Sequence, residues 1–327
     1  MKRIVWLLCL CAALLPLAGC SGTRQAEAPQ EAPVVLPYAS SLAKQGITGS
    51  ITLPKRPERV VTLTNSPVLA LYELGVPQAA VPDTKILQWP EGLEKQAKKI
   101  QTGMRSNIDL ESVIALHPDL VIAGFYAKDT YGKILEREGI PVYYVEAGPS
   151  VPFDAVKEQT LLFADAFGGQ SEKAGRIRQR FARVEAQMAK EKEHYAGRQV
   201  MVIQGAPPRL FLQNRFGTVG SMLDRLGFIN VAPAKGGIMV PLNRETALSY
   251  KPDLIVSVDP MGGAVQQQAL MEKEFAAHGE YWNRFEAVRN KRVLYLPKWF
   301  AVSGGLEELD QLEYLMKELK RWEDRPV

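Results

Sequence analysis

One pattern of apolar and polar positions occurs twice in the chain, in residues 109–122 and again, with every position in register, in residues 243–256. Each copy begins with Asp or Asn, which is suited to capping a helix, and places a Glu in the first turn, where a carboxylate meets the positive end of the helix. A Pro-Asp dipeptide then ends the helix, because the residue before a proline is pushed out of the helical region, and an apolar run predicts a buried strand. Two such copies indicate duplicated lobes.

The residues around the first copy alternate between short apolar runs and helical stretches, some of which stop at a glycine. Strands that alternate with helices are typical of a parallel sheet. The predicted strands are residues 60–63, 79–81, 120–123 and 142–145, and the predicted helices are residues 67–74 and a segment that ends at Gly139.

Residues 153–195 carry strong helical character and no strand signal, with one interruption at Gly168 and Gly169. Ser171 is suited to cap the second of these helices, which would be ~37 Å long if it reached Tyr195. That length is enough to connect two lobes. Four apolar residues recur at helical spacing along one face of this helix: Ile177, Phe181, Val184 and Met188.

The residues around the second copy repeat the alternation, which predicts an α/β fold with two lobes, each a mostly parallel sheet flanked by helices. Leu309, Leu312, Leu315, Met316 and Leu319 face inward on a predicted closing helix. The predicted strands are residues 200–203, 254–258 and 293–296, and the predicted helices are residues 218–226 and 306–321.

Residues 1–19 have the properties of a cleavable leader. Lys2 and Arg3 give a positive start, the apolar stretch that follows is too short to span a membrane comfortably, and Leu17-Ala18-Gly19 forms a small-residue cleavage site before Cys20. Leu-Ala-Gly-Cys resembles the lipobox of bacterial lipoproteins, which implies cleavage before Cys20 and a lipid on its sulfur. The alternative is an ordinary signal peptide with a chance cysteine.

After Cys20 the composition shifts to Ala, Pro, Glu and Gln, which is typical of a flexible tether. Folded sequence is expected to begin with a small hairpin in residues 47–53. The expected organisation is a signal peptide (1–19), a lipidated cysteine and tether (20–46), an N-terminal lobe (47–150), connecting helices (151–197) and a C-terminal lobe (198–327).

Composition fits an exported globular protein. The chain of 327 residues is 46% hydrophobic and 23% charged. Its formal charge is +4, and removal of Lys2 and Arg3 would leave +2. So small a positive charge does not indicate binding to nucleic acid. Because all three cysteines lie in or beside the leader, the mature domain would have no disulfide and must depend on its core.

The common catalytic motifs are missing from the sequence: there is no G-x-S-x-G, no H-E-x-x-H, no Walker loop and no dinucleotide fingerprint. Carriers of bare zinc or manganese need several converging His and carboxylate ligands. His117, His194 and His278 are scattered and none has a partner at ligand spacing, so transport of a bare metal ion is disfavoured.

The order of motifs resembles the solute-binding proteins of ABC importers for ferric siderophores, haem and cobalamin. The shared order is a lipobox, a tether, an Arg-Val-Val strand, a helix ending Leu-Gly-Val, the two copies of the repeat on either side of a long helix, and a closing helix. This resemblance covers nearly the whole mature chain. It implies two lobes joined by a rigid helix with a ligand cleft between them, no intrinsic cofactor, and a monomer that works with a permease and its ATPase.

In that family an acidic residue on each lobe docks to arginines of the permease. The matching residues here are Glu111 and Glu245, one in each copy of the repeat. The alternative role is stabilisation of a helix terminus, at ~0.3–1 kcal/mol each.

Loops at the carboxyl ends of parallel strands line the cleft in such sheets, and most of the candidate residues there are aromatic or apolar. A flat, largely apolar ligand with a few anionic groups would suit them, because the arginines can pair with carboxylates. The expected ligand-binding residues are Asn65, Trp89, Met104, Arg105, Tyr126, Arg215, Phe216, Met261, Trp299 and Phe300.

Haem is one candidate ligand, because thioethers can be axial ligands of haem iron and Met104 and Met261 could bind the iron from opposite lobes. Both could equally be apolar contacts in a cleft or core. The Tyr and His ligands of known haem carriers are not kept at the aligned positions, so siderophores and corrinoids stay open.

The sequence therefore indicates an exported binding lipoprotein, anchored by Cys20 to the outer surface of the cell membrane or facing the periplasm, that captures haem or a ferric siderophore rather than catalysing a reaction. A cobalamin-binding protein of the same family is the first alternative. An exported enzyme on a bilobal scaffold and a lipoprotein that binds only other proteins are the others.

Overall fold

The computed structural model describes residues 32–102, 108–148, 151–302 and 305–323. These residues belong to one compact unit, from Ala32 onwards, that contains every helix, strand and core described below. The expected leader, Cys20, Met104 and Arg105 lie outside the described residues. No described helix is both long enough and apolar enough to cross a membrane.

The N-terminal sheet confirms the predicted parallel arrangement. Its five strands have the order β5-β4-β3-β6-β7, and every neighbouring pair is parallel. The three-residue β5 was not predicted, because two lysines in Lys-Lys-Ile hide the apolar signal of this edge strand. The strands are β3 (Val60–Thr62), β4 (Gln78–Pro82), β5 (Lys98–Ile100), β6 (Leu120–Gly124) and β7 (Val142–Val145).

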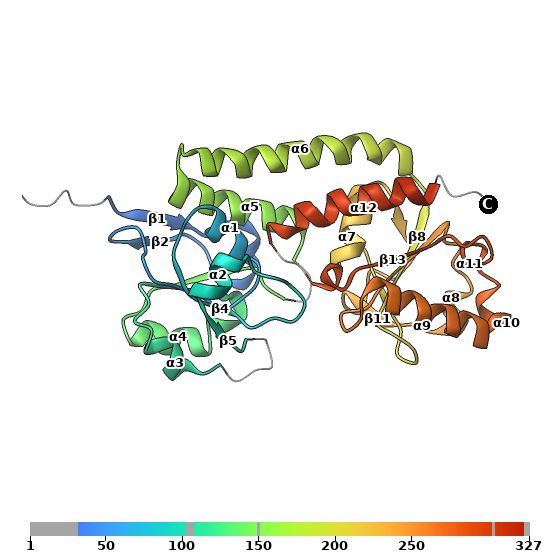
Figure 1. Cartoon of the computed structure of the whole chain (residues 1–327), viewed down its shortest axis with the longest axis horizontal. Coiled ribbons are helices and arrows are strands. Elements are labelled where there is room, and N and C mark those ends of the chain that lie inside the picture. Colours follow the sequence, from blue (N-terminus) through green and yellow to red (C-terminus); the bar gives the residue numbers. More distant parts are fainter. Residues whose placement is uncertain (1–31, 103–107, 149–150, 303–304, 324–327) are drawn as a thin grey trace, which may run out of the picture. The chain divides into compact units, whose positions relative to one another are not determined.

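Short helices connect these strands (Figure 1). Gly75 and Gly139, each just after a helix, have the left-handed backbone that favours glycine, with φ of 70° and 76°, as their predicted role as helix stops requires. The helices are α1 (Val68–Glu73), α2 (Glu91–Gln96), α3 (Leu110–Ile114), the 3-10 turn η2 (Phe125–Ala127) and α4 (Tyr131–Arg137).

The start of the folded chain differs from the expectation. β1 (Val34–Pro37) pairs antiparallel with β2 (Ser50–Leu53), and the 3-10 turn η1 (Ser40–Gln45) lies between them. The expected tether therefore extends too far, and the hairpin is wider than residues 47–53. The cause is side-chain burial: Leu36 is fully buried, and the Tyr38 ring stacks on Tyr143 at 5.0 Å, although the surrounding composition is that of a linker.

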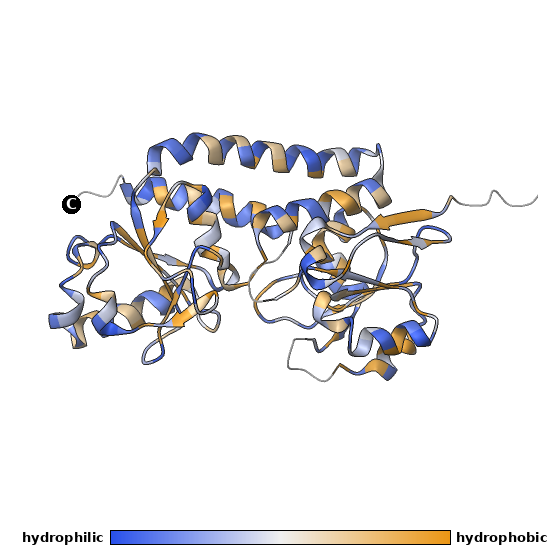
Figure 2. Ribbon diagram, turned by 180° about the vertical axis from the view of Figure 1, so that it is seen from behind, coloured by the Kyte–Doolittle hydropathy of each residue, from blue (hydrophilic) through white to orange (hydrophobic). Residues whose placement is uncertain are grey.

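The helical segment between the sheets follows the prediction closely. It consists of α5 (Phe153–Phe163), the π-helical turn η3 (Ala164–Gly168) and α6 (Glu172–Tyr195). Ser171 caps α6, because its hydroxyl accepts a hydrogen bond from the Ala174 N–H at 3.3 Å. Apolar and polar residues alternate along α6 (Figure 2), and all four of the apolar residues predicted for one face are buried.

The C-terminal sheet has the order β11-β9-β8-β12-β13, with β10 also beside β8. Its parallel strands were predicted except for the two-residue β10, whereas the antiparallel pair β9 and β11 was not. The strands are β8 (Gln199–Gln204), β9 (Phe211–Gln213), β10 (Ile229–Asn230), β11 (Met239–Pro241), β12 (Leu254–Val258) and β13 (Val293–Leu296).

Helices surround this sheet, and the closing helix α12 has the predicted inward face, with all five predicted residues buried. The helices are α7 (Thr218–Arg225), α8 (Arg244–Ala247), α9 (Ala264–Ala277), α10 (Gly279–Trp282), α11 (Glu286–Arg289), the 3-10 turn η4 (Lys298–Ala301) and α12 (Glu307–Glu323).

The two long helices α6 and α12 pack against each other (Figure 1). Arg180 on α6 makes an ion pair with Glu73 on α1 at 2.8 Å and another with Asp310 on α12 at 3.0 Å. One continuous core, which includes side chains from both sheets and from α5, α6 and α12, lies beneath these contacts. The helical connection is therefore packed along its length rather than free.

Each copy of the repeat forms the same local structure. The Asp109 carboxylate accepts a hydrogen bond from the Ser112 N–H at 3.0 Å, and Asn243 does the same with the Thr246 N–H at 2.9 Å. These bonds cap α3 and α8 as predicted. Hydrogen bonding with Ser112 lowers the pKa of the Asp109 carboxyl.

The aspartate of each Pro-Asp dipeptide binds backbone on the neighbouring central strand. Asp119 accepts the N–H groups of Glu58 and Arg59, just before β3, at 2.7 and 2.9 Å. Asp253 accepts the N–H of Gln199, the first residue of β8, at 2.7 Å. The repeat therefore fixes the amino end of a parallel strand pair in each sheet.

Replacing Asp119 with alanine is expected to lower the free energy of unfolding by roughly 1–2 kcal/mol, because two backbone donors lose a charged acceptor. Urea denaturation would measure the change. Asp129→Ala is the matched control, since it removes only an exposed ion pair with Lys133, and such pairs contribute ~0–1 kcal/mol. Equal effects of the two substitutions would contradict a strand-capping role for Asp119.

Candidate functional site

Most of the expected cargo residues follow the carboxyl ends of parallel strands, whereas Arg215 and Phe216 follow β9, which is antiparallel to β8. In the N-terminal sheet, Asn65 follows β3, Trp89 follows β4 and Tyr126 follows β6. In the C-terminal sheet, Met261 follows β12 and Trp299 follows β13. Since neighbouring parallel strands end at the same edge of a sheet, each sheet gathers the candidate residues that follow its parallel strands at one edge.

Loops from these two carboxyl edges contact each other. Lys298, after β13, donates a hydrogen bond from Nζ to the Lys85 carbonyl, after β4, at 2.8 Å. Trp299 packs against a buried cluster that contains Leu87 and Trp89. The backbone of Gly305, before α12, lies against the Ser66 carbonyl, after β3. The structure therefore brings the two sets of candidate loops together.

Some of the aromatic candidates are enclosed by this packing. Trp89 is 4% exposed and donates its indole N–H to the Pro82 carbonyl at 3.1 Å, and Phe300 is fully buried in the main core. Trp299 is half-buried, with ring contacts to Phe300 and Tyr314. In this structure Trp89 and Phe300 are buried beneath the contacting loops. Trp299 is the partly exposed one of these three aromatic residues.

Exposed cationic and apolar side chains follow two strands of the C-terminal sheet, with Arg215 and Phe216 after β9 and Met261 after β12. The Arg215 guanidinium lies 4.9 Å from the centre of the Phe216 ring, which is 47% exposed. Met261 is 87% exposed, and its N–H donates to the Asp259 carboxylate at 3.2 Å. These side chains can offer an apolar surface and a positive charge to a bound molecule.

Buried polar groups hold the loop that carries Arg215 and Phe216. The Asn214 amide donates to the carbonyls of Pro233 and Gly237 at 3.0 and 2.7 Å, and its oxygen accepts the Phe216 N–H at 3.0 Å. Asn214 is only 1% exposed. The loop is therefore fixed by satisfied hydrogen bonds before any ligand arrives.

In the N-terminal sheet, Asn65 and Tyr126 are both half-buried. Burial raises the pKa of the Tyr126 phenol, so its hydroxyl stays protonated at neutral pH and can donate a hydrogen bond. The Phe125 ring lies against Tyr126 edge to face, with centres 5.9 Å apart. Asn65 and Tyr126 therefore offer neutral polar groups at this edge.

Glu111 and Glu245 occupy equivalent places in the first turns of α3 and α8. Both side chains are exposed, and among the described residues neither carboxylate takes part in an ion pair or hydrogen bond. An acidic side chain that meets no internal cation is available to a cation of another molecule.

The three histidines lie in different parts of the fold. His194 contacts Glu323 at 2.7 Å, and His278 is 3.8 Å from Glu274. His117 has a positive φ of 46° at the turn of the first repeat. Within the described ranges, no cluster of three or more His, Cys, Asp or Glu side chains could hold a metal ion.

Sequence reasoning missed Val265, which is 84% exposed at the start of α9 and lies four residues beyond Met261. It also missed a buried polar pair near the same edge, where Gln267 donates to the Ser257 hydroxyl at 2.7 Å. An isolated valine among glycines and glutamines has no periodicity, and a buried glutamine in a helix resembles a surface residue, so the sequence held no usable signal for either.

The chain is 26% identical to the ABC transporter substrate-binding lipoprotein YvrC of Bacillus subtilis, over 95% of this chain and 96% of YvrC. It is 30% identical to a cobalamin-binding protein of Halobacterium salinarum, over 69% of this chain and 58% of that protein. The solved structure of S. aureus IsdE complexed with heme has the same fold, with a TM-score of 0.63 at 19% identity over 80% of this chain and 98% of IsdE.

The similarity extends to a whole family. Residues 60–299, from the first strand of the N-terminal sheet to the turn after the last strand of the C-terminal sheet, match the periplasmic binding protein family. That span includes both copies of the repeat and the helices between them. The chain therefore belongs to the periplasmic binding protein family.

Proposed function

We propose that this chain is the substrate-binding lipoprotein of an ABC importer, and that it captures an iron complex, haem or a ferric siderophore, for delivery to a membrane permease and its ATPase. The observation that carries the proposal is the contact between loops at the carboxyl edges of the two sheets. Exposed Met261 follows a strand at one of these edges, and exposed Arg215 and Phe216 follow β9. YvrC, which aligns along nearly its whole length, is named as a substrate-binding lipoprotein.

The chemistry of these exposed side chains favours a large, partly apolar anion. Haem and many ferric siderophores combine flat or apolar surfaces with negatively charged oxygens, which the Phe216 ring and the Arg215 guanidinium can each contact. The protein's task in this proposal is to bind and release, with no bond made or broken. The cargo is held by the residues at the two carboxyl edges, including Asn65, Tyr126 and Trp299.

A corrinoid is the alternative cargo, because one relative is a cobalamin-binding protein. Cobalamin is also large and has a broad flat ring, but it carries less accessible negative charge than haem. Dependence of binding on Arg215 therefore discriminates between the two classes. A strong loss of affinity in Arg215→Gln favours haem or a ferric siderophore, and a small loss favours a corrinoid.

The test is a titration of residues 21–327, which contain the whole compact unit. Hemin, a ferric siderophore and cobalamin are each added, and quenching of tryptophan fluorescence measures binding. Loss of a buried aromatic contact costs ~1.5–3 kcal/mol, so Phe216→Ala is expected to raise the Kd of the cargo by roughly ten- to hundredfold. Binding of none of the three compounds would contradict the proposed cargo classes.

Ile229→Ala is the matched control for Phe216→Ala. Ile229 is 55% exposed, close to the 47% of Phe216, but it lies in β10, paired with Gln199, and is not among the candidate cargo residues. Its replacement should leave the Kd unchanged. An equal loss in both variants would indicate a general effect on the fold rather than contact with cargo.

Ligation of haem iron by a thioether is a separate part of the proposal. Met261 is exposed and therefore accessible to a bound haem, and Met104 lies outside the described residues. If Met261 binds the iron, hemin should produce a shifted Soret band that weakens in Met261→Ala but not in Val265→Ala, its equally exposed neighbour. An unshifted spectrum on the intact protein would rule thioether ligation out.

Export and anchoring complete the proposal. The leader and Cys20 carry the sequence features of a lipoprotein, and YvrC is itself named as a lipoprotein. We place the protein on the outer surface of the cell membrane or facing the periplasm, held by a lipid on Cys20. In this arrangement Glu111 and Glu245 are the carboxylates that contact the permease.

A further inference from the structure

A pocket of about 360 Å³ lies in the C-terminal part of the chain and is separate from the proposed cargo site. It is formed by the turn of the second repeat, by residues around α11 and by the residue before β13. Its volume falls within the range of small-molecule sites, ~300–1,000 Å³. The lining residues are Tyr250, Lys251, Pro252, Asp253, Arg284, Phe285, Glu286, Arg289 and Arg292.

The pocket and the cargo residues lie at opposite ends of the same strand. Pro252 and Asp253 immediately precede β12, whereas Met261 follows its carboxyl end. A five-residue strand spans ~17 Å, so a molecule in the pocket does not reach the exposed Met261 side chain. The pocket therefore needs an explanation of its own.

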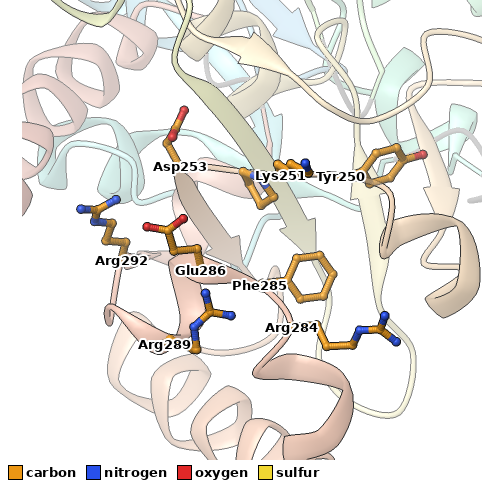
Figure 3. Close-up of a pocket in the computed structure, with 9 residues that line it drawn as sticks. Tyr250, Lys251, Asp253, Arg284, Phe285, Glu286, Arg289 and Arg292 are labelled. Carbon is orange, nitrogen blue, oxygen red and sulfur yellow. The ribbon is translucent and has the colours of Figure 1, made fainter.

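Four cationic side chains surround the pocket, as Figure 3 shows: those of Lys251, Arg284, Arg289 and Arg292. Within the described part of the chain, Lys251, Arg284 and Arg292 make no hydrogen bond or ion pair through their side chains, and Arg289 donates one bond, to the Asn283 carbonyl at 2.7 Å. Arginines elsewhere in the chain are commonly paired, as Arg244 is with Glu274 at 2.8 Å. The unpaired guanidinium groups of residues that line a pocket keep their donors for a ligand.

The two carboxylates of the pocket leave a positive excess. Asp253 is already bonded to the Gln199 N–H, and Glu286 accepts a bond from the Asn290 amide at 3.2 Å. Four cations against two carboxylates give the lining a net charge of +2. The pocket therefore favours an anion over a cation or a neutral molecule.

The floor of the pocket is apolar and well supported. Pro252 and Phe285 are buried, and the Phe285 ring packs against Trp282 and Tyr281 with centres 5.8 and 5.4 Å apart. Phe285 belongs to the core under this end of the sheet. A ligand would thus meet a packed apolar base beside cationic donors.

We propose that this pocket binds a phosphate group carried by a small organic molecule. A phosphate group matches the planar, forked donors of arginine, which can bind two of its oxygens at once, and its organic part can rest on Phe285 and Pro252. The phosphate can belong to a soluble ester or to a lipid headgroup. The site lies apart from the cargo and binds independently of it.

Isothermal titration of residues 21–327 with glycerol 3-phosphate tests for the soluble source, and sedimentation with vesicles of phosphatidylglycerol and phosphatidylcholine tests for the lipid source. The double variant Arg284→Gln, Arg292→Gln removes two unpaired cations and keeps most of the side-chain volume. Loss of two charge-assisted hydrogen bonds is expected to weaken binding at least tenfold. Cargo affinity should stay unchanged.

Lys273→Gln is the control, because Lys273 is an exposed cation on α9 that does not line the pocket. Binding to glycerol 3-phosphate or to phosphatidylglycerol vesicles that is lost in the double variant and kept in Lys273→Gln supports the site and identifies its source. Absence of binding to both probes, or equal binding by the intact protein and the double variant, overturns the proposal whatever the cargo proves to be.

Discussion

Replacing Gly305 with alanine is expected to destabilise the protein by on the order of 3 kcal/mol or more. Two costs add here. Gly305 has a φ of 72°, which L-residues with a side chain rarely adopt, and a Cβ at this position would lie 1.7 Å from the Ser66 carbonyl oxygen. Backbone rather than a flexible side chain blocks the new atom, so one of the two loops must move. Thermal or urea denaturation would measure the loss.

Gly139→Ala separates these two costs. Gly139 has a nearly identical φ of 76°, but nothing lies within 4 Å of the position that a Cβ would occupy. Its replacement should therefore cost only the backbone strain, roughly 1 kcal/mol. Similar losses in the two variants would show that the loops carrying Gly305 and Ser66 can separate easily.

Reversal of both repeat glutamates, in the double variant Glu111→Lys, Glu245→Lys, is expected to reduce uptake of the cargo tenfold or more while the purified protein binds cargo as before. Each carboxylate is exposed and, within the described residues, unpaired, so the reversal breaks no internal contact. If the two carboxylates meet cations of the permease, the reversal replaces two attractions with two repulsions, which cost several kcal/mol in a contact. Uptake in cells and the Kd of the purified variant measure the two effects.

The control reverses two other exposed glutamates, Glu138 and Glu280, and so applies the same change in net charge at positions outside the repeat. This variant should import cargo normally. Normal uptake by the Glu111, Glu245 variant would show that these carboxylates serve only their own helix termini. A fall in uptake for both variants would point to long-range charge effects rather than to docking.

The elements that the sequence predicted share a strong periodic signal. The central strands β3, β6, β8 and β12 are continuous apolar runs, as strands buried on both faces must be, and the predicted face of α6 is buried throughout. The caps at Asp109, Asn243 and Ser171 were readable because they depend on residues a few positions away.

The missed strands lack that signal for physical reasons. Gln213 in β9 is buried but polar, and its side-chain amide donates a hydrogen bond to the Gln204 side chain at 2.6 Å. The strand therefore shows no continuous apolar run. β1 has only Leu36 fully buried. β9 pairs with nearby β8 and with the more distant β11, and β1 pairs with β2 across the turn η1. The apolar pattern of one short segment does not show such pairing.

The candidate cargo site was predictable at the level of loops but not of side chains. The rule that carboxyl ends of parallel strands gather at one edge located the loops of Trp89, Met261 and Phe300. It could not show that Met261 is 87% exposed and Phe300 is fully buried, because that depends on how the two edges pack together. The cationic pocket was missed because Arg284 and Arg292 flank elements with no motif.

The capping residues of the repeat show how the loop sequences of such a fold can change while its helices and strands are kept. The positions that make the two copies alike hold helix termini and strand ends, through Asp109, Asn243, Asp119 and Asp253, and these residues lie away from the exposed Met261 side chain. Mutations in the cargo loops can therefore accumulate in descendant genes while the duplicated pattern is preserved. The residues that record the duplication are therefore separate from the loops that are expected to select the ligand.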